Sequence, residues 1–150
     1  MRSTRNSPLP LNEGGSPDPR TSARMARIRQ KGTKIETIVA AALRDVGAYY
    51  RKNVKTLPGS PDFANRSKRW AIFVNGCFWH HHQGCSRATV PKSNRKFWTA
   101  KFRDNQRRDA RCAMRLRREG YRVIIIWECQ QDQIRDKLAK VLEPRSVDAR

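Results

Sequence analysis

The segment from Phe73 to Cys85, FVNGCFWHHHQGC, concentrates side chains that can bind metals or transfer protons. Within it, Cys77, His82 and Cys85 have the spacing C-x4-H-x2-C, and Cys129 ends a later apolar run. Thiolates and imidazoles are the ligands that zinc prefers, and four protein ligands are typical of a structural ion. The spacing therefore predicts a Cys3His zinc site. The alternative is that Cys77 and Cys129 are small buried apolar residues and that His82 is one of three exposed imidazoles.

Two carboxylates are candidates for catalysis on a phosphodiester. Asp62 follows two prolines and a glycine, which predict a turn that places it at the start of a short extended run. Such a carboxylate can hold Mg²⁺ against a phosphate, although an aspartate after proline is also a common turn residue. Glu36 follows Thr33 by three residues, which is the capping-box pattern, so it is either a helix cap or an active-site residue. We expect Asp62 and the His/Cys segment to lie close together, because both follow strand ends.

Large aromatic side chains separate the predicted metal ligands. Phe78 and Trp79 follow Cys77 directly, and a rigid metal-bound loop could present them as a wedge between base steps of a duplex. Buried packing of the same pair is the alternative, and the sequence alone does not choose between them.

Apolar periodicity predicts the elements that position these residues. Helices are expected from Ile35 to Val46, from Ser93 to Glu119 and from Ile134 to Leu142, and buried strands from Trp70 to Val74 and from Arg122 to Trp127. The order of helix, strands, helix, strand and helix predicts an α/β sheet covered by helices. Cys112, inside the arginine-rich second helix, is expected in the core rather than at the metal.

Charge and composition point to a partner. The 150 residues include 33 Lys and Arg against 13 Asp and Glu, a net charge of +20. This balance indicates nucleic acid rather than a surface charged only for solubility. No apolar run approaches the roughly 20 residues of a spanning helix, and no signal peptide is recognisable. We therefore expect no membrane partner, a cytoplasmic location and reduced thiols. Residues 1–22 are expected to be a disordered basic arm, residues 23–143 the folded domain and residues 144–150 a polar tail.

Several segments together resemble a known family. They are PGSPDF at 58–63, FVNGCFWHHHQGC at 73–85, KFW at 96–98, NQRRD at 105–109 and GYRVIIIWEC at 120–129. From about Ser22 to Leu142 the chain is similar to the very short patch repair (Vsr) DNA mismatch endonucleases. The resemblance implies a restriction-endonuclease-like core of the PD-(D/E)xK superfamily, with a central mixed sheet flanked by helices. It implies a bacterial, nucleoid-associated monomer that uses Mg²⁺ to nick double-stranded DNA 5′ of the thymine in a T:G mismatch, the product of 5-methylcytosine deamination. Mismatch-repair proteins are further partners that it suggests.

The resemblance also assigns roles by position. Asp62 corresponds to the Mg²⁺-binding aspartate, His80 to the catalytic histidine that handles proton transfer, and Glu36 to a glutamate near the active site. The structural zinc ligands would be Cys77, His82, Cys85 and Cys129. Phe78, Trp79 and Trp98 resemble a wedge that enters the major groove, and Met25 resembles the residue that enters from the opposite groove. Asp109 falls on an aspartate near the active site, and a solvated helix position is an equally good account of it.

One position departs from the family pattern. Asn75 stands where a histidine assists phosphate hydrolysis in the family, and a carboxamide does not exchange protons near neutral pH. We expect slower turnover from this substitution, with His80 as the principal acid/base group and His81 as a surface residue. Two other classes stay open: a zinc-stabilised DNA-binding module without catalysis, and a restriction or defence nuclease that cuts matched DNA.

Overall fold

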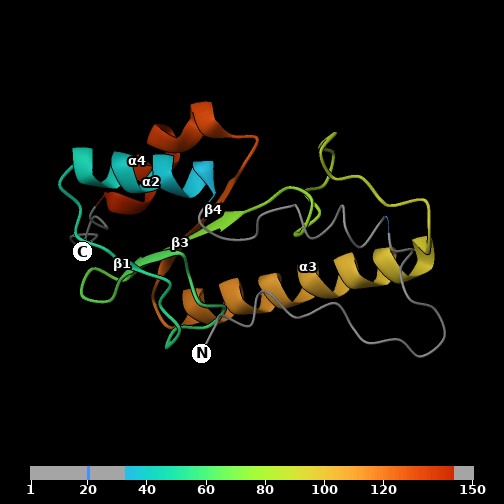
Figure 1. The fold of residues 1–150 in the computed structure, drawn as a ribbon. Coiled ribbons are helices and arrows are strands. Elements are labelled where there is room, and N and C mark those ends of the chain that lie inside the picture. Colours follow the sequence, from blue (N-terminus) through green and yellow to red (C-terminus); the bar gives the residue numbers. More distant parts are fainter. Residues whose placement is uncertain (1–19, 21–32, 144–150) are drawn as a thin grey trace.

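Four strands form one sheet with helices on both faces in the computed structural model, which describes residue 20 and residues 33–143 (Figure 1). The elements are α2 (Lys34–Asp45), β1 (Arg51–Lys52), β2 (Phe63–Asn65), β3 (Trp70–Asn75), α3 (Arg95–Arg118), β4 (Arg122–Trp127), the 3-10 turn η1 (Gln131–Gln133) and α4 (Ile134–Leu142). None of the helices within this part of the chain is long and apolar enough to cross a membrane. Met25, the arm predicted at 1–22 except for Arg20, and the tail at 144–150 lie outside the described residues.

The sheet is mixed, as predicted. Its strand order is β1-β2-β3-β4, with β1, β2 and β3 antiparallel and β3 parallel to β4. A parallel pair needs a long crossover, and α3 supplies it. The parallel pairing ends with Asn75 opposite Trp127, so the carboxyl ends of β3 and of the edge strand β4 lie side by side.

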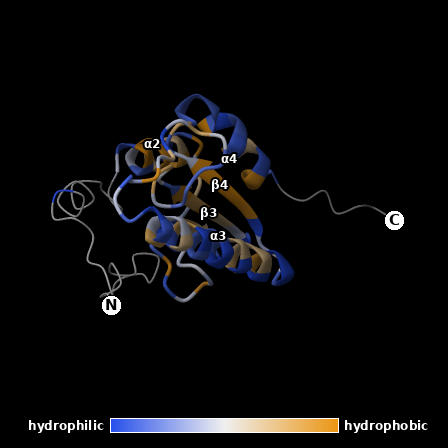
Figure 2. Ribbon diagram, turned by 90° about the vertical axis from the view of Figure 1, so that its right-hand side faces the viewer, coloured by the Kyte–Doolittle hydropathy of each residue, from blue (hydrophilic) through white to orange (hydrophobic). Residues whose placement is uncertain are grey.

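Two apolar layers enclose strand β3. Alternate residues of β3 point to opposite faces, so that Ile72 and Val74 pack towards α2 and α4 whereas Ala71 and Phe73 pack towards α3. All six residues of β3 are buried, which explains why this strand reads as a continuous apolar run in the sequence, whereas β4 at the sheet edge is buried only at Val123 and Ile126. Figure 2 shows both strands in hydrophobic colours between helices whose outer surfaces are hydrophilic.

A side-chain cap and a backbone conformation determine where helices α2 and α3 begin. The Thr33 side chain accepts the backbone N–H of Glu36 at 3.4 Å, which confirms the predicted cap of α2. Helix α3 begins at Arg95 rather than at Ser93, because Asn94 adopts a left-handed conformation with a φ of 58°. Strand β1 was not predicted, since two residues at the sheet edge carry no periodicity of their own.

Candidate metal centre and catalytic cluster

The parallel register of β3 and β4 brings the predicted metal ligands together. Asn75 pairs with Trp127, and Cys77 and Cys129 each follow two residues after this pair. The turn after β3 then returns, because the backbone N–H of His82 bonds to the carbonyl of Cys77 at 2.9 Å. The donor atoms of Cys77, His82, Cys85 and Cys129 all lie within 4.8 Å of one another.

The spacing of these donors suits a tetrahedral ion. The Nδ1 atom of His82 lies 3.7 Å from the sulfur of Cys77 and 3.4 Å from that of Cys129. A zinc ion with ordinary Zn–S and Zn–N bonds would separate such a pair by roughly 3.6 Å. The indole of Trp127 stacks on the His82 ring, with centroids 4.1 Å apart and an interplanar angle of 7°, and so holds the ring in this orientation. These residues fit a structural zinc ion by ligand type, number and spacing.

The thiols of this group differ electrostatically. Burial raises the pKa of the Cys77 thiol to about 12, whereas a hydrogen bond from the backbone N–H of Arg87 lowers the pKa of Cys85. Burial also lowers the pKa of His82, which favours the neutral imidazole that binds metals. An ion that binds Cys77 must displace its proton.

A histidine–carboxylate pair lies beside the metal ligands. The Nδ1 atom of His80 is 2.5 Å from Oδ2 of Asp109, and only 12% and 18% of the two side chains are exposed. The backbone N–H of His80 bonds to the carbonyl of Gly76, which fixes the turn that carries it. Asp109 is therefore not the solvated helix position that the sequence left open. A carboxylate at Nδ1 holds the proton on that nitrogen, so Nε2 is the atom that can accept a proton.

Two carboxylates line a cleft of about 220 Å³ on the α2 side of the sheet. Oδ2 of Asp62 accepts the backbone N–H of Val74 at 2.6 Å, which accounts for a carboxylate that is only 4% exposed. Glu36 lines the same cleft together with Arg44 and Lys52. Carboxylate oxygens are the ligands that Mg²⁺ prefers, so Asp62 and Glu36 fit this ion. The sequence did not predict that Arg44 and Lys52 line this cleft. Lys52 lies on a strand of only two residues, which is too short to show a periodic pattern, and Arg44 of α2 meets Lys52 only through that strand.

The predicted catalytic residues thus fall into two groups at the carboxyl end of β3. Asp62 and Glu36 form the first group. His80 and Asp109 belong to the second, and Asn75 joins them, since it lines a small cavity of about 60 Å³ with Asp109 and Arg108. Asn75 is 2% exposed and its side chain lies on the α3 side of the sheet, as the alternation along β3 requires. The end of one buried strand therefore positions both groups.

The aromatic residues predicted to enter DNA form a cluster beneath the metal-ligand loop. Phe78 and Trp98 are buried and pack with Phe102, whereas Trp79 is half-buried at the margin. A wedge role for Phe78 or Trp98 requires that side chain to leave this cluster. Trp79 is the accessible member, and its backbone carbonyl is held by the side chain of Asn105 at 3.0 Å.

His81 and Cys112 were predicted to lie outside the metal site. The prediction that His81 is a surface residue is wrong, because a left-handed backbone conformation with a φ of 48° turns its ring onto Phe102 at 4.6 Å. Cys112 does not join the metal ligands. It is half-buried and packs close to Gly59, where an added Cβ would lie 2.8 Å from the Cβ of Cys112.

The sequence of this chain is similar to those of known proteins. The family model described as DNA mismatch endonuclease Vsr matches residues 16–87. The DNA mismatch endonuclease Vsr of Escherichia coli (strain K12) is 42% identical over 108 residues, which are 72% of this chain and 69% of the relative. The type II nicking enzyme V.XorIIP of Xanthomonas oryzae pv. oryzae is 37% identical over 123 residues, 80% of this chain and 90% of the relative. The type II nicking enzyme V.NaeI of Lentzea aerocolonigenes is 33% identical over 141 residues, 91% and 79% of the respective chains.

Proposed function

This chain belongs to the Vsr family of DNA mismatch endonucleases, and on that premise we propose that it nicks one strand of duplex DNA 5′ of the thymine in a T:G mismatch. The reaction is Mg²⁺-dependent phosphodiester hydrolysis, and it starts very short patch repair of deaminated 5-methylcytosine. The observation that carries the proposal is the His80–Asp109 pair, which lies at the same strand end as the Asp62 carboxylate.

Affinity for DNA comes from charge before any base is read. The net charge is +20, and α3 presents exposed basic side chains along most of its length: Arg95, Lys96, Arg103, Arg107, Arg111, Arg115, Arg117 and Arg118. Each side chain that neutralises a phosphate releases condensed counterions, which makes the affinity salt-dependent.

Proton transfer falls to the histidine. Asp109 orients the imidazole of His80 so that Nε2 can take a proton from the attacking water. Asp62 and Glu36 would hold Mg²⁺, which when bound neutralises charge on the scissile phosphate and makes a bound water more acidic. Asn75 supplies a hydrogen-bonding group to this region but no proton.

Selection of the mismatch would rest on the aromatic side chains. A T:G wobble pair stacks less well than a matched pair and costs less to open, so a wedge favours it. Trp79 is the residue best placed to enter first, because it is half-buried whereas Phe78 and Trp98 are buried.

A nicking assay tests the function. The substrate is an end-labelled duplex with one T:G pair, in a panel of contexts that includes CT(A/T)GG, beside its T:A control, with and without Mg²⁺. We expect one Mg²⁺-dependent nick 5′ of the mismatched thymine and none in the control. Tight binding without any cleavage across the panel would contradict the proposal and favour the DNA-binding module.

A second candidate is a nicking enzyme that belongs to a restriction or defence system and cuts matched DNA. It is favoured by the relatives whose names describe type II nicking enzymes. The same assay separates the two, because equal cleavage of the T:G and T:A duplexes would identify this class.

Replacing Asp109 with asparagine tests the histidine pair. An amide that donates to Nδ1 reverses the tautomer of His80 and removes the base from Nε2, so we expect the nicking rate to fall on the order of 10²-fold or more. Single-turnover nicking measures the rate and anisotropy measures DNA binding, which should stay unchanged. Asp104→Asn is the matched control, because it removes the same charge from an exposed position of the same helix. Similar rates for both variants would exclude Asp109 as a positioning residue.

A further inference from the structure

A second hollow, of about 410 Å³, lies across β1 from the carboxylate cleft. Its polar lining consists of Tyr49, Arg51, Thr56, Asn65, Arg66 and Ser67, over a floor of Val54 and Ala64. We propose that this hollow binds the sugar-phosphate backbone of duplex DNA that flanks the nick, a contact outside the catalytic cleft. The inference rests on the proposed function, since it assumes that DNA is bound at that cleft.

Side-chain hydrogen bonds hold the walls of the hollow in place. Asn65, which is only 8% exposed, donates to the carbonyl of Tyr49 at 3.0 Å and accepts the backbone N–H of Lys68 at 2.9 Å. It thereby ties the chain before β1 to the turn after β2. On the other side, the guanidinium of Arg66 donates to the hydroxyl of Thr56. The hollow is therefore built by the fold and is not a gap between loose side chains.

The chemistry of the walls suits a phosphate backbone. Arginine, tyrosine, threonine and serine are among the side chains that contact DNA phosphates and sugars. None of the described residues that line the hollow is acidic, whereas the catalytic cleft is lined by Asp62 and Glu36. The Tyr49 side chain is 71% exposed, so its hydroxyl is accessible as a donor. The two sites thus differ in charge. The cleft with Asp62 and Glu36 would bind a phosphate through a metal ion, whereas the hollow would bind a phosphate directly.

The position of β1 connects the hollow to the cleft. Arg51 pairs with Ala64 and Lys52 with Phe63, and neighbouring residues of a strand point to opposite faces of the sheet. Lys52 lines the carboxylate cleft and Arg51 lines the hollow, so the edge strand presents one cation to each site.

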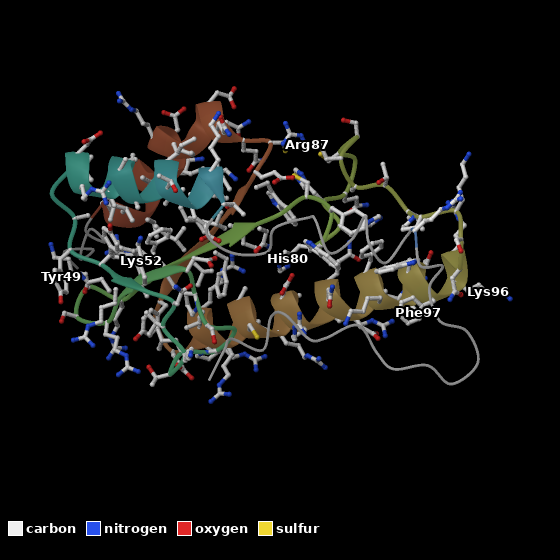
Figure 3. All side chains as sticks on the ribbon, viewed as in Figure 1. Tyr49, Lys52, His80, Arg87, Lys96 and Phe97 are labelled. Carbon is white, nitrogen blue, oxygen red and sulfur yellow. The ribbon has the colours of Figure 1, made fainter. Side chains whose placement is uncertain are left out.

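Figure 3 shows Tyr49 and Lys52 at one end of the molecule and Lys96 and Phe97 at the other, with His80 between them. Because Lys52 and Arg51 are neighbours on β1, we expect a duplex in the cleft that continues past the edge of the sheet to reach the hollow. Such a contact adds affinity without reading bases, since phosphate contacts set register and orientation only.

Duplex length and salt test this site. Anisotropy titrations use the 150-residue chain with one equivalent of zinc supplied and no added Mg²⁺. The T:G duplexes end near the nick or extend by about ten base pairs on one side or the other. For the wild type, we expect an extension on one side alone to tighten binding. In the double variant Arg51→Ala/Arg66→Ala that gain should disappear, and the slope of log Kd against log[salt] should fall by about 1.8, which is about 0.9 for each lost phosphate contact.

Matched variants control for charge and folding. Arg135→Ala/Lys140→Ala removes two exposed charges from α4 and should keep the gain from the extended duplex. Because Arg66 bonds to Thr56, thermal unfolding is compared for every variant, and Arg51→Ala alone should lose about half of the change in slope. Tyr49→Phe should weaken binding to the extended duplex with an unchanged slope.

The outcomes separate the flanking site from the proposed function. Equal gain and equal slope in the wild type and the double variant would overturn the site, as would no gain from either extension. Inorganic phosphate at millimolar concentration tests for a free anion. The flanking site would also be overturned if phosphate raised the melting temperature of the wild type but not of the double variant, while the affinity of the wild type for DNA did not depend on duplex length. The hollow would then bind a free anion. For each of these outcomes, the double variant should nick the short duplex at the wild-type rate, which shows that its catalytic site is intact. Failure of the wild type to nick would instead overturn the proposed function.

Discussion

Asp62→Asn is expected to lower the nicking rate by at least about 10³-fold, or about 4 kcal/mol of transition-state stabilisation, with little change in affinity for a T:G duplex. The carboxylate is the group that would hold Mg²⁺, and an amide is a poor substitute for it. The asparagine oxygen can still accept the backbone N–H of Val74, which Asp62 accepts at 2.6 Å. Asparagine therefore removes the charge and retains the bond that joins the start of β2 to β3. Single-turnover nicking and anisotropy measure the two effects.

Two variants make this result interpretable. Asp62→Ala removes the acceptor as well, and an unpaired buried N–H costs about 1–3 kcal/mol, so part of its loss would be structural. Asp45→Asn removes a carboxylate from the exposed end of α2 and should nick at the wild-type rate. If Asp62→Asn nicked like the Asp45 control, Asp62 would not be the metal-binding carboxylate.

Cys129→Ser is expected to abolish stoichiometric zinc binding and to lower the free energy of unfolding on the order of 3 kcal/mol. Cys129 is the informative ligand because its side chain is exposed, so that serine causes little loss of packing. The buried Cys77 would combine a packing change with loss of the metal. Urea unfolding with and without a chelator, together with the zinc content of the purified protein, measures both effects. The chelator should destabilise the wild type and leave Cys129→Ser unchanged.

Cys112→Ser is the matched control for the metal site, because it makes the same chemical change outside the ligand group. It should retain zinc and lose less than about 1 kcal/mol of stability. If Cys129→Ser bound as much zinc as Cys112→Ser, Cys129 would not be needed as a zinc ligand.

The sequence predicted the parts of this fold that repeat a simple period. The β-branched run from Arg122 to Trp127 and the periodic segment from Ile134 to Leu142 became β4 and α4 at the expected bounds. Cys129 could be added to the local trio because β3 and β4 end on the same side of the sheet. That side is common to Cys77 and Cys129 only if the strands are parallel, which the single long helix between them favours.

The remaining features depend on tertiary geometry. The contact between His80 and Asp109 spans 29 residues and requires knowledge of which face of α3 packs inward. The resemblance placed Asp109 near the active site but left a solvated helix position open, and the packing of α3 decides between the two. His81 was misassigned because a single left-handed residue reverses the direction of its ring. The cleft residues Arg44 and Lys52 come together through an edge strand of two residues, which is too short to show a pattern.

The parallel register has a consequence for how this protein can fail. His80 lies in sequence between two of the metal ligands, Cys77 and His82, and Asn75 is two residues before the first of them. The loop that would close around zinc also carries His80, the proposed general base, so we expect loss of the ion to loosen both. On the proposed function, oxidation of the exposed Cys129 thiol would lower the nicking rate without altering the proposed acid or base groups. Loss of zinc would act through the same loop, and on the same proposal it would lower strand nicking more than DNA binding.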